Sequence, residues 1–68
     1  MNKTETPAMP LWAVELRKFR RLRDITQSQF GEWFGVTQQA VALWETGTVE
    51  PPVAVLAWLV DQGGRLDA

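Results

Sequence analysis

Residues 26–47, TQSQFGEWFGVTQQAVALWETG, restrict the possible folds of this chain more than any other stretch. Thr26 and Gln29 form a capping-box pattern, in which the threonine oxygen accepts a free amide of the first helical turn and the glutamine reaches back to the cap. Gly35 stands where a helix can end in the left-handed conformation that glycine tolerates best. Because Thr37 can then cap a second helix, the sequence predicts two short helices joined by a tight turn, over residues 27–34 and 38–45.

The apolar residues of this stretch repeat at helical spacing. Phe30 and Phe34 lie one turn apart in the first predicted helix, and Val41 and Trp44 form a stripe on the second. Gly31 lies inside the first helix, where glycine costs about 1 kcal/mol relative to alanine, and we expect its missing Cβ to let the second helix cross closely. Two capped helices with a glycine turn and a small residue at the crossing describe a helix-turn-helix.

This segment resembles the lambda-type phage repressor and Cro family of helix-turn-helix regulators, also called the XRE family, over roughly residues 16–59. The residues that carry the resemblance are Thr26, Gln27, Phe30, Gly31, Phe34, Gly35, Val36, Thr37, Trp44, Glu45, Gly47 and Pro51, with Arg20 seven positions before Gln27. The sequence departs from the family at Gly31, where alanine is more common, and at Asp24, where glycine is common. The resemblance implies an all-α, compact four-helix domain of the lambda-repressor type.

Two further helices complete the predicted domain. A first helix over residues 11–23 would bury Trp12, Leu16 and Phe19. A last helix follows Pro51-Pro52, since proline suits a first helical turn, and we expect it to bury Val53, Leu56 and Leu59. The predicted organisation is a flexible arm over residues 1–10, a helix-turn-helix domain over residues 11–62 and a short tail over residues 63–68.

The composition narrows the possible functions. The 68 residues allow one domain. They contain no Cys, His or Tyr, so the sequence lacks thiolate metal ligands, the most common metal ligand and general base, which is histidine, and the tyrosine phenol. We therefore expect no catalytic activity, no metal and no cofactor. No apolar run has the length of a membrane span, so we expect a cytoplasmic protein. The net charge is −1, but residues 15–24 carry net +3, and this local field is compatible with binding to DNA.

The exposed start of the helix over residues 38–45 is the candidate for reading bases. A glutamine can pair bidentately with adenine N6 and N7 in the major groove, and Gln38 and Gln39 are placed to read neighbouring base pairs. Leu43, which can contact a thymine methyl group, and Ala42 complete the base-reading candidates. The alternatives are a solvated helix start for the glutamines and packing against the side of the domain for Leu43.

A different set of residues is expected to contact the DNA backbone. Gln27 begins a helix whose free amides and positive dipole end suit an anion, and the family resemblance also assigns it to the backbone. The full set of backbone candidates is Thr26, Gln27, Thr37, Thr46, Thr48, Arg17 and Arg20. The basic residues of the first helix are equally compatible with a merely solvated face. The resemblance further implies an ion pair between Arg20 and Glu45.

The resemblance implies a transcriptional regulator, a repressor on a palindromic operator, in a phage or another mobile element. One recognition helix reads only a few base pairs, so we expect a homodimer. The last helix is apolar nearly all round, and its outward residues, with one from the tail, are the predicted interface: Val55, Trp58, Val60 and Leu66. A competing possibility is that the segment with Leu11 and Trp12 covers this helix. An alternative function is an antitoxin that binds both a toxin and its own promoter.

Overall fold

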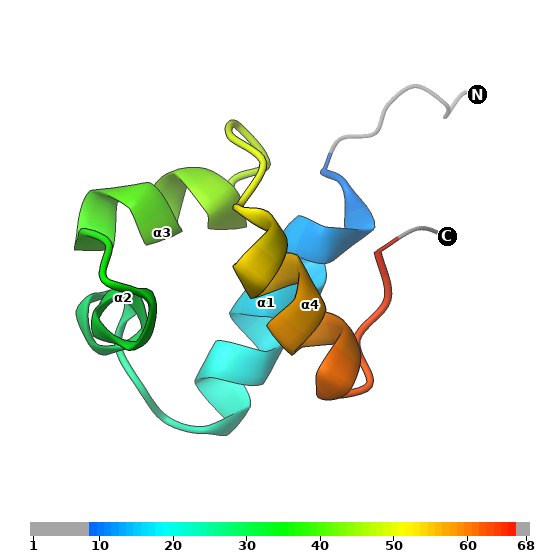
Figure 1. The fold of residues 1–68 in the computed structure, drawn as a ribbon, viewed down its shortest axis with the longest axis horizontal. Coiled ribbons are helices and arrows are strands. Elements are labelled where there is room, and N and C mark those ends of the chain that lie inside the picture. The colour runs from blue at the N-terminus through cyan, green and yellow to red at the C-terminus, as the bar shows by residue number, and fades with distance from the viewer. Residues whose placement is uncertain (1–8, 67–68) are drawn as a thin grey trace.

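The structure of the protein is a computed structural model that describes residues 9–66. Within that range the chain forms four helices, α1 (Leu11–Leu22), α2 (Gln27–Phe34), α3 (Gln38–Glu45) and α4 (Val53–Asp61), and no strand. α2 packs on α3, and α1 contacts both α3 and α4 (Figure 1). The all-α prediction is confirmed, and the predicted bounds of α2 and α3 agree with the structure. None of the described helices is both long and apolar enough to span a membrane.

Local side-chain caps define where α2 and α3 begin. The Thr26 hydroxyl oxygen accepts the Gln29 backbone N–H at 3.0 Å, and the Thr26 N–H donates to the Gln29 side chain at 2.8 Å. The Thr37 hydroxyl oxygen accepts the Ala40 N–H at 3.1 Å. Gly35 ends α2 in the left-handed conformation, with φ of 69°. These contacts confirm the capping pattern predicted for the two helices.

The missing side chain of Gly31 lets the turn between α2 and α3 lie very close to α2. The close contact is with this turn and not with α3 itself. A Cβ at this position would lie 2.6 Å from the Val36 carbonyl oxygen and 3.2 Å from that of Thr37. The Val36 N–H also donates to the Gly31 carbonyl at 2.9 Å, which closes the turn tightly onto the helix. The absence of a side chain at Gly31 therefore sets the distance between α2 and the start of α3.

The core lies where the four helices meet. Its fully or nearly fully buried members are Leu16, Phe30, Val41, Trp44, Val55 and Leu59. Phe30 is also the centre of an aromatic cluster, with ring centroids 5.5 Å from Trp33, 5.2 Å from Phe34 and 5.2 Å from Trp58. Trp33 lies at the edge of this cluster and is half exposed.

The face of α4 that enters the core differs from the predicted one. Val53 is 80% exposed, whereas Val55 is completely buried and Leu59 is buried beside it. The prediction that Val53 is a core residue and Val55 an outward one is therefore wrong. Because α4 is apolar on nearly every side, the spacing of its apolar residues does not mark a single face, and packing against the other helices decides which residues are buried.

A buried carboxylate joins α1 to the segment that follows α4. Glu15 is 8% exposed, and it accepts a hydrogen bond from the Arg65 backbone N–H at 3.2 Å and pairs with Lys18 at 2.9 Å. The backbone also packs closely here, because a Cβ on Gly64 would lie 2.7 Å from the Cδ1 atom of Leu59.

Residues 1–8 of the predicted arm and residues 67–68 of the predicted tail lie outside the described residues.

Candidate nucleic-acid interface

The start of α3 presents two glutamines to solvent. Gln38 and Gln39 are both exposed and directly follow the Thr37 cap. Leu43, one turn further on, is 37% exposed, and Ala42 is half-buried. Val41 and Trp44 point into the core, so α3 is anchored by one side and presents amide groups at its exposed end. Amides in this position can pair with base edges in the major groove of DNA.

Gln38 is held by a hydrogen bond to the first residue of α2. Its Nε2 donates to the Gln27 Oε1 at 2.9 Å, and the Gln27 Nε2 donates to the Glu45 Oε1 at 3.1 Å. Gln27 is half-buried between the two. The starts of α2 and α3 are therefore joined through side chains as well as through the turn.

Glu45 is buried at the end of α3 and bound to α1. Arg20 donates from Nε to Oε2 at 2.6 Å and from Nη2 to Oε1 at 3.0 Å, which is a bidentate ion pair. The Arg20 Nη1 donates to the Ile25 carbonyl at 2.8 Å. The hydrogen bond to Glu45 raises the pKa of Arg20, although burial opposes this shift. The ion pair implied by the resemblance is present, and it turns the Arg20 guanidinium inward.

A comparison with protein families identifies this arrangement. A family model described as Helix-turn-helix matches residues 16–59, well over half of the chain. The chain belongs to the XRE-type helix-turn-helix family. Comparisons with curated proteins and with solved structures found no match. The family match shows that the protein is a DNA-binding regulator in general terms. The matched range includes Arg20, Gln27, Gln38 and Glu45, whose side chains are joined by hydrogen bonds.

The threonines of this helix-turn-helix differ in whether their hydroxyl hydrogens are available to bind a DNA phosphate. Thr26 and Thr37 accept backbone N–H groups as caps, which leaves each hydroxyl hydrogen free for a phosphate. Thr46 donates to the Leu43 carbonyl at 3.1 Å, and its oxygen lies 2.8 Å from that of Thr48. Since the Thr46 hydrogen is already used, Thr48 is the donor in that pair, and both would have to rotate to reach a phosphate.

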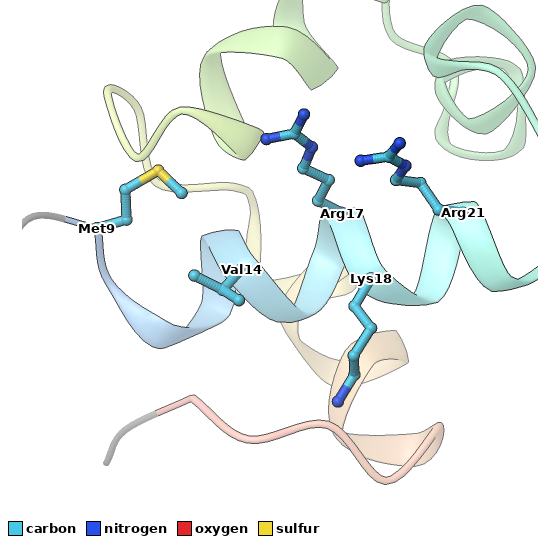
Figure 2. Close-up of a pocket in the computed structure, with 5 residues that line it drawn as sticks. All are labelled: Met9, Val14, Arg17, Lys18 and Arg21. Atoms are coloured by element: carbon cyan, nitrogen blue, oxygen red, sulfur yellow. The ribbon is translucent and has the colours of Figure 1, made fainter.

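The helix-turn-helix is flanked by a basic face of α1. A shallow hollow of about 300 Å³ is lined by Met9, Val14, Arg17, Lys18 and Arg21. In Figure 2 the Arg17 and Arg21 side chains extend toward one edge of this hollow, and the Lys18 side chain extends toward the other edge. Lys18 pairs with Glu15 at 2.9 Å. Arg17, Lys18 and Arg21 are all exposed, but within the described residues only Lys18 of these three is paired with a carboxylate. Of the two remaining arginines, only Arg17 is among the backbone candidates predicted from the sequence.

The residues predicted for a dimer interface are not all on one surface. Val60 is 52% exposed and Leu66 is 36% exposed, but Val55 lies in the core. Trp58 is half-buried, and its ring packs on those of Phe30, Trp33 and Phe34. Val55 is therefore wrong as an interface residue, because α4 is rotated so that Val55 and Leu59 enter the core together.

Proposed function

We propose that the protein is a transcriptional repressor that binds a two-fold symmetric operator as a homodimer, with α3 in the major groove. The observation that carries this proposal is the Gln38 amide, which is exposed at the start of α3 and already oriented by Gln27 at 2.9 Å. An amide with a fixed orientation loses little conformational freedom when it pairs with a base edge. Gln39 beside it would read the neighbouring base pair.

Backbone contacts would position α3 without reading sequence. The amides at the start of α2 and the free hydroxyl hydrogens of Thr26 and Thr37 suit one phosphate-binding region. Arg17 and Arg21 would supply charge from α1, since Lys18 is paired with Glu15. Arg20 contributes mainly by holding Glu45, because its three described hydrogen bonds all go to Glu45 and to Ile25.

The dimer would form through the exposed face of α4. Val53, Ala57 and Val60 are all exposed and follow one another at helical spacing on this face. Val60 belongs to the interface predicted from the sequence, and Val53 and Ala57 replace the buried Val55. A two-fold arrangement would set the two α3 helices about 34 Å apart, which is one turn of DNA. In the antitoxin alternative, a different protein would cover the same face.

Selection of bound sequences from a random duplex pool tests the proposal. We expect a site with two-fold symmetry whose half-site contains adenine at one or two positions. Gln38→Ala and Gln39→Ala should each cost about 1–3 kcal/mol on this site and relax preference at one or two positions. A pool without enrichment, or an unchanged site in both variants, would contradict the proposal.

A further inference from the structure

The shallow hollow on α1 combines positive charge with exposed apolar groups. It holds about 300 Å³ and is lined by Met9, Val14, Arg17, Lys18 and Arg21 (Figure 2). Its members on α1 occupy positions i, i+3, i+4 and i+7, so they share one face of the helix. Met9 is 38% exposed and Val14 is 44% exposed. The hollow therefore offers apolar contact area and cations side by side.

The protein itself neutralises only part of the charge of this hollow. Lys18 pairs with Glu15 at 2.9 Å. Among the residues that the structure describes, neither Arg17 nor Arg21 belongs to an ion pair, and both are exposed. Two guanidinium groups are thus left for an anionic occupant, since opposite charges favour association.

We propose that this hollow is a docking site for an acidic segment of another protein, in which carboxylates flank an apolar side chain. The carboxylates would pair with Arg17 and Arg21, and the apolar side chain would lie on Met9 and Val14. Docking of this kind does not depend on DNA binding, and so it goes beyond the proposed function.

Other occupants use the hollow less completely. A DNA phosphate needs the cations, but it gains nothing from the exposed thioether of Met9 and the exposed Val14. A small organic anion needs a site that buries most of its surface, whereas this hollow is shallow and open to solvent. A segment of a protein can leave part of its surface in water and still gain from both kinds of contact. Met and Arg are also enriched in protein–protein interfaces.

The hollow lies next to the proposed DNA-binding surface. A Cβ on Gly47 would lie 2.7 Å from the Pro10 Cδ and 3.8 Å from the Met9 Cα, so the segment before α1 rests on the loop that follows α3. Arg17 and Arg21 are also the cations proposed to bind phosphates. A docked segment would occupy these arginines beside that loop, and we expect it to exclude DNA. This competition, unlike the docking itself, rests on the proposed function.

Selection from a random peptide library, displayed on phage, against the full chain tests the docking site without DNA. We expect the enriched peptides to carry Asp or Glu on both sides of Leu, Ile, Met or Phe. One enriched peptide, labelled with a fluorophore, then serves as the probe, and fluorescence anisotropy measures its Kd.

Substitutions separate the charged and the apolar parts of the site. Arg17→Gln and Arg21→Gln should each weaken binding of the probe about two- to fivefold, as expected for exposed ion pairs. Val14→Ser should weaken it about threefold or more, because it removes apolar contact area. Val49→Ser is the matched control, since Val49 is a valine with the same 44% exposure on the loop that follows α3. It should bind the probe like the wild type.

Competition is measured with the probe and a duplex that the wild-type protein enriches from a random pool. The probe should displace this duplex from the wild type. Val14→Ser should bind the duplex as the wild type does, because Val14 is not a proposed DNA contact, but its release should require about threefold or more of the probe. Thermal unfolding monitored by circular dichroism shows whether each variant is folded.

The docking site is disproved if no peptide is enriched, if the enriched peptides are not acidic, or if Val14→Ser or both arginine variants bind the probe as tightly as Val49→Ser does. A loss of self-association in Val14→Ser, measured by sedimentation, would also overturn it, because the occupant would then be a second copy of the chain. A probe that binds without displacing the duplex would contradict the competition alone. If the wild type enriches no duplex, the proposed function and the competition fail, and the Kd of the probe still decides the docking site.

Discussion

Arg20 and Glu45 are separated by 25 residues in the chain, and their side chains meet in a bidentate ion pair with N–O distances of 2.6 and 3.0 Å. The side chain of Glu45 is 4% exposed and that of Arg20 is 13% exposed. The pair joins the last turn of α1 to the end of α3. It thus fixes α3 against the rest of the domain, and Gln27 binds to the same carboxylate.

Removing either partner of this pair should destabilise the fold strongly. Arg20→Ala and Glu45→Ala should each cost about 3–5 kcal/mol, because each leaves the other charge buried without its partner. The double variant should cost clearly less than the sum of the two. Urea unfolding of the four proteins measures this coupling, and additive effects would show that the two side chains do not stabilise each other.

The salt dependence of DNA binding should distinguish the cations of α1. Arg17→Gln and Arg21→Gln should each lower the slope of log K against log salt concentration by about 0.9 for every phosphate that the arginine neutralises. Base preferences should stay unchanged, since binding to phosphates carries no direct sequence information.

Lys18→Gln is the matched control for this measurement. Lys18 lines the same hollow on α1, but its side chain extends away from those of the two arginines (Figure 2), and it pairs with Glu15. Its replacement should leave the slope unchanged. If Lys18→Gln lowered the slope as much as either arginine substitution, the positive charge of α1 would act as a whole and not through individual phosphate contacts.

Two valines on α4 should have opposite effects. Val60→Glu places a charge on the exposed face and should abolish dimer formation and cooperative operator binding while the monomer stays folded. Val55→Ala should instead cost about 2 kcal/mol of stability, since Val55 is completely buried. Sedimentation measures the first effect and urea unfolding the second. A Val60→Glu variant that remains dimeric would exclude this face as the interface.

Trp58→Glu would combine two effects and is therefore unsuitable as a test of dimerisation. The Trp58 ring packs on Phe30 at 5.2 Å and on Trp33 at 5.9 Å between centroids, and the Arg23 guanidinium lies 5.5 Å from its centroid. A glutamate in that position would disrupt the monomer as well as any interface. The exposed Val60 separates the two effects.

Gly31→Ala should destabilise the protein despite the better helix propensity of alanine. The new Cβ would lie 2.6 Å from the Val36 carbonyl oxygen, so the turn between α2 and α3 must shift. Overpacking typically costs about 1–3 kcal/mol, and alanine gains roughly 1 kcal/mol in a helix, so we expect a net loss of up to about 2 kcal/mol. Glu32→Ala, at the exposed neighbouring position, is the control. A Gly31→Ala variant with increased thermal stability would contradict the prediction.

Glu15 should make stability depend on pH in the acid range. The hydrogen bond from Lys18 is the main cause that holds the pKa of Glu15 below its ordinary value of 4.5, with the Arg65 amide assisting and burial opposing. A carboxylate with a lowered pKa in the folded state stabilises above its unfolded pKa, and this contribution is lost as the pH falls through the folded pKa.

Thermal unfolding of the wild type and of Glu15→Gln, from neutral pH downward, measures this contribution. The wild type should lose stability below about pH 4.5, and Glu15→Gln should be less stable at neutral pH but lose less on acidification. Glu32→Gln, at an exposed position, should follow the wild type. Parallel acid profiles of the wild type and Glu15→Gln would show that Glu15 is not responsible.

The sequence alone determines the helix boundaries at the centre of this fold. Thr26 with Gln29, and Thr37 with Ala40, act within four residues of one another, so their geometry depends on the local chain. Gly35 likewise ends α2 through its own backbone freedom. The Arg20–Glu45 pair was accessible only through the family resemblance, since nothing in the spacing of two charges 25 residues apart requires them to meet.

Tertiary structure decided what the local pattern left open. In α4 nearly every residue is apolar, so only contact with the other helices selects Val55 and Leu59 for the core and leaves Val53 in solvent. The hydrogen bonds of Gln27 to Glu45 and Gln38 require α2 and both ends of α3 to be packed together. Capping depends on neighbours along the chain, whereas burial and side-chain networks depend on neighbours in space, and these exist only once the helices have packed.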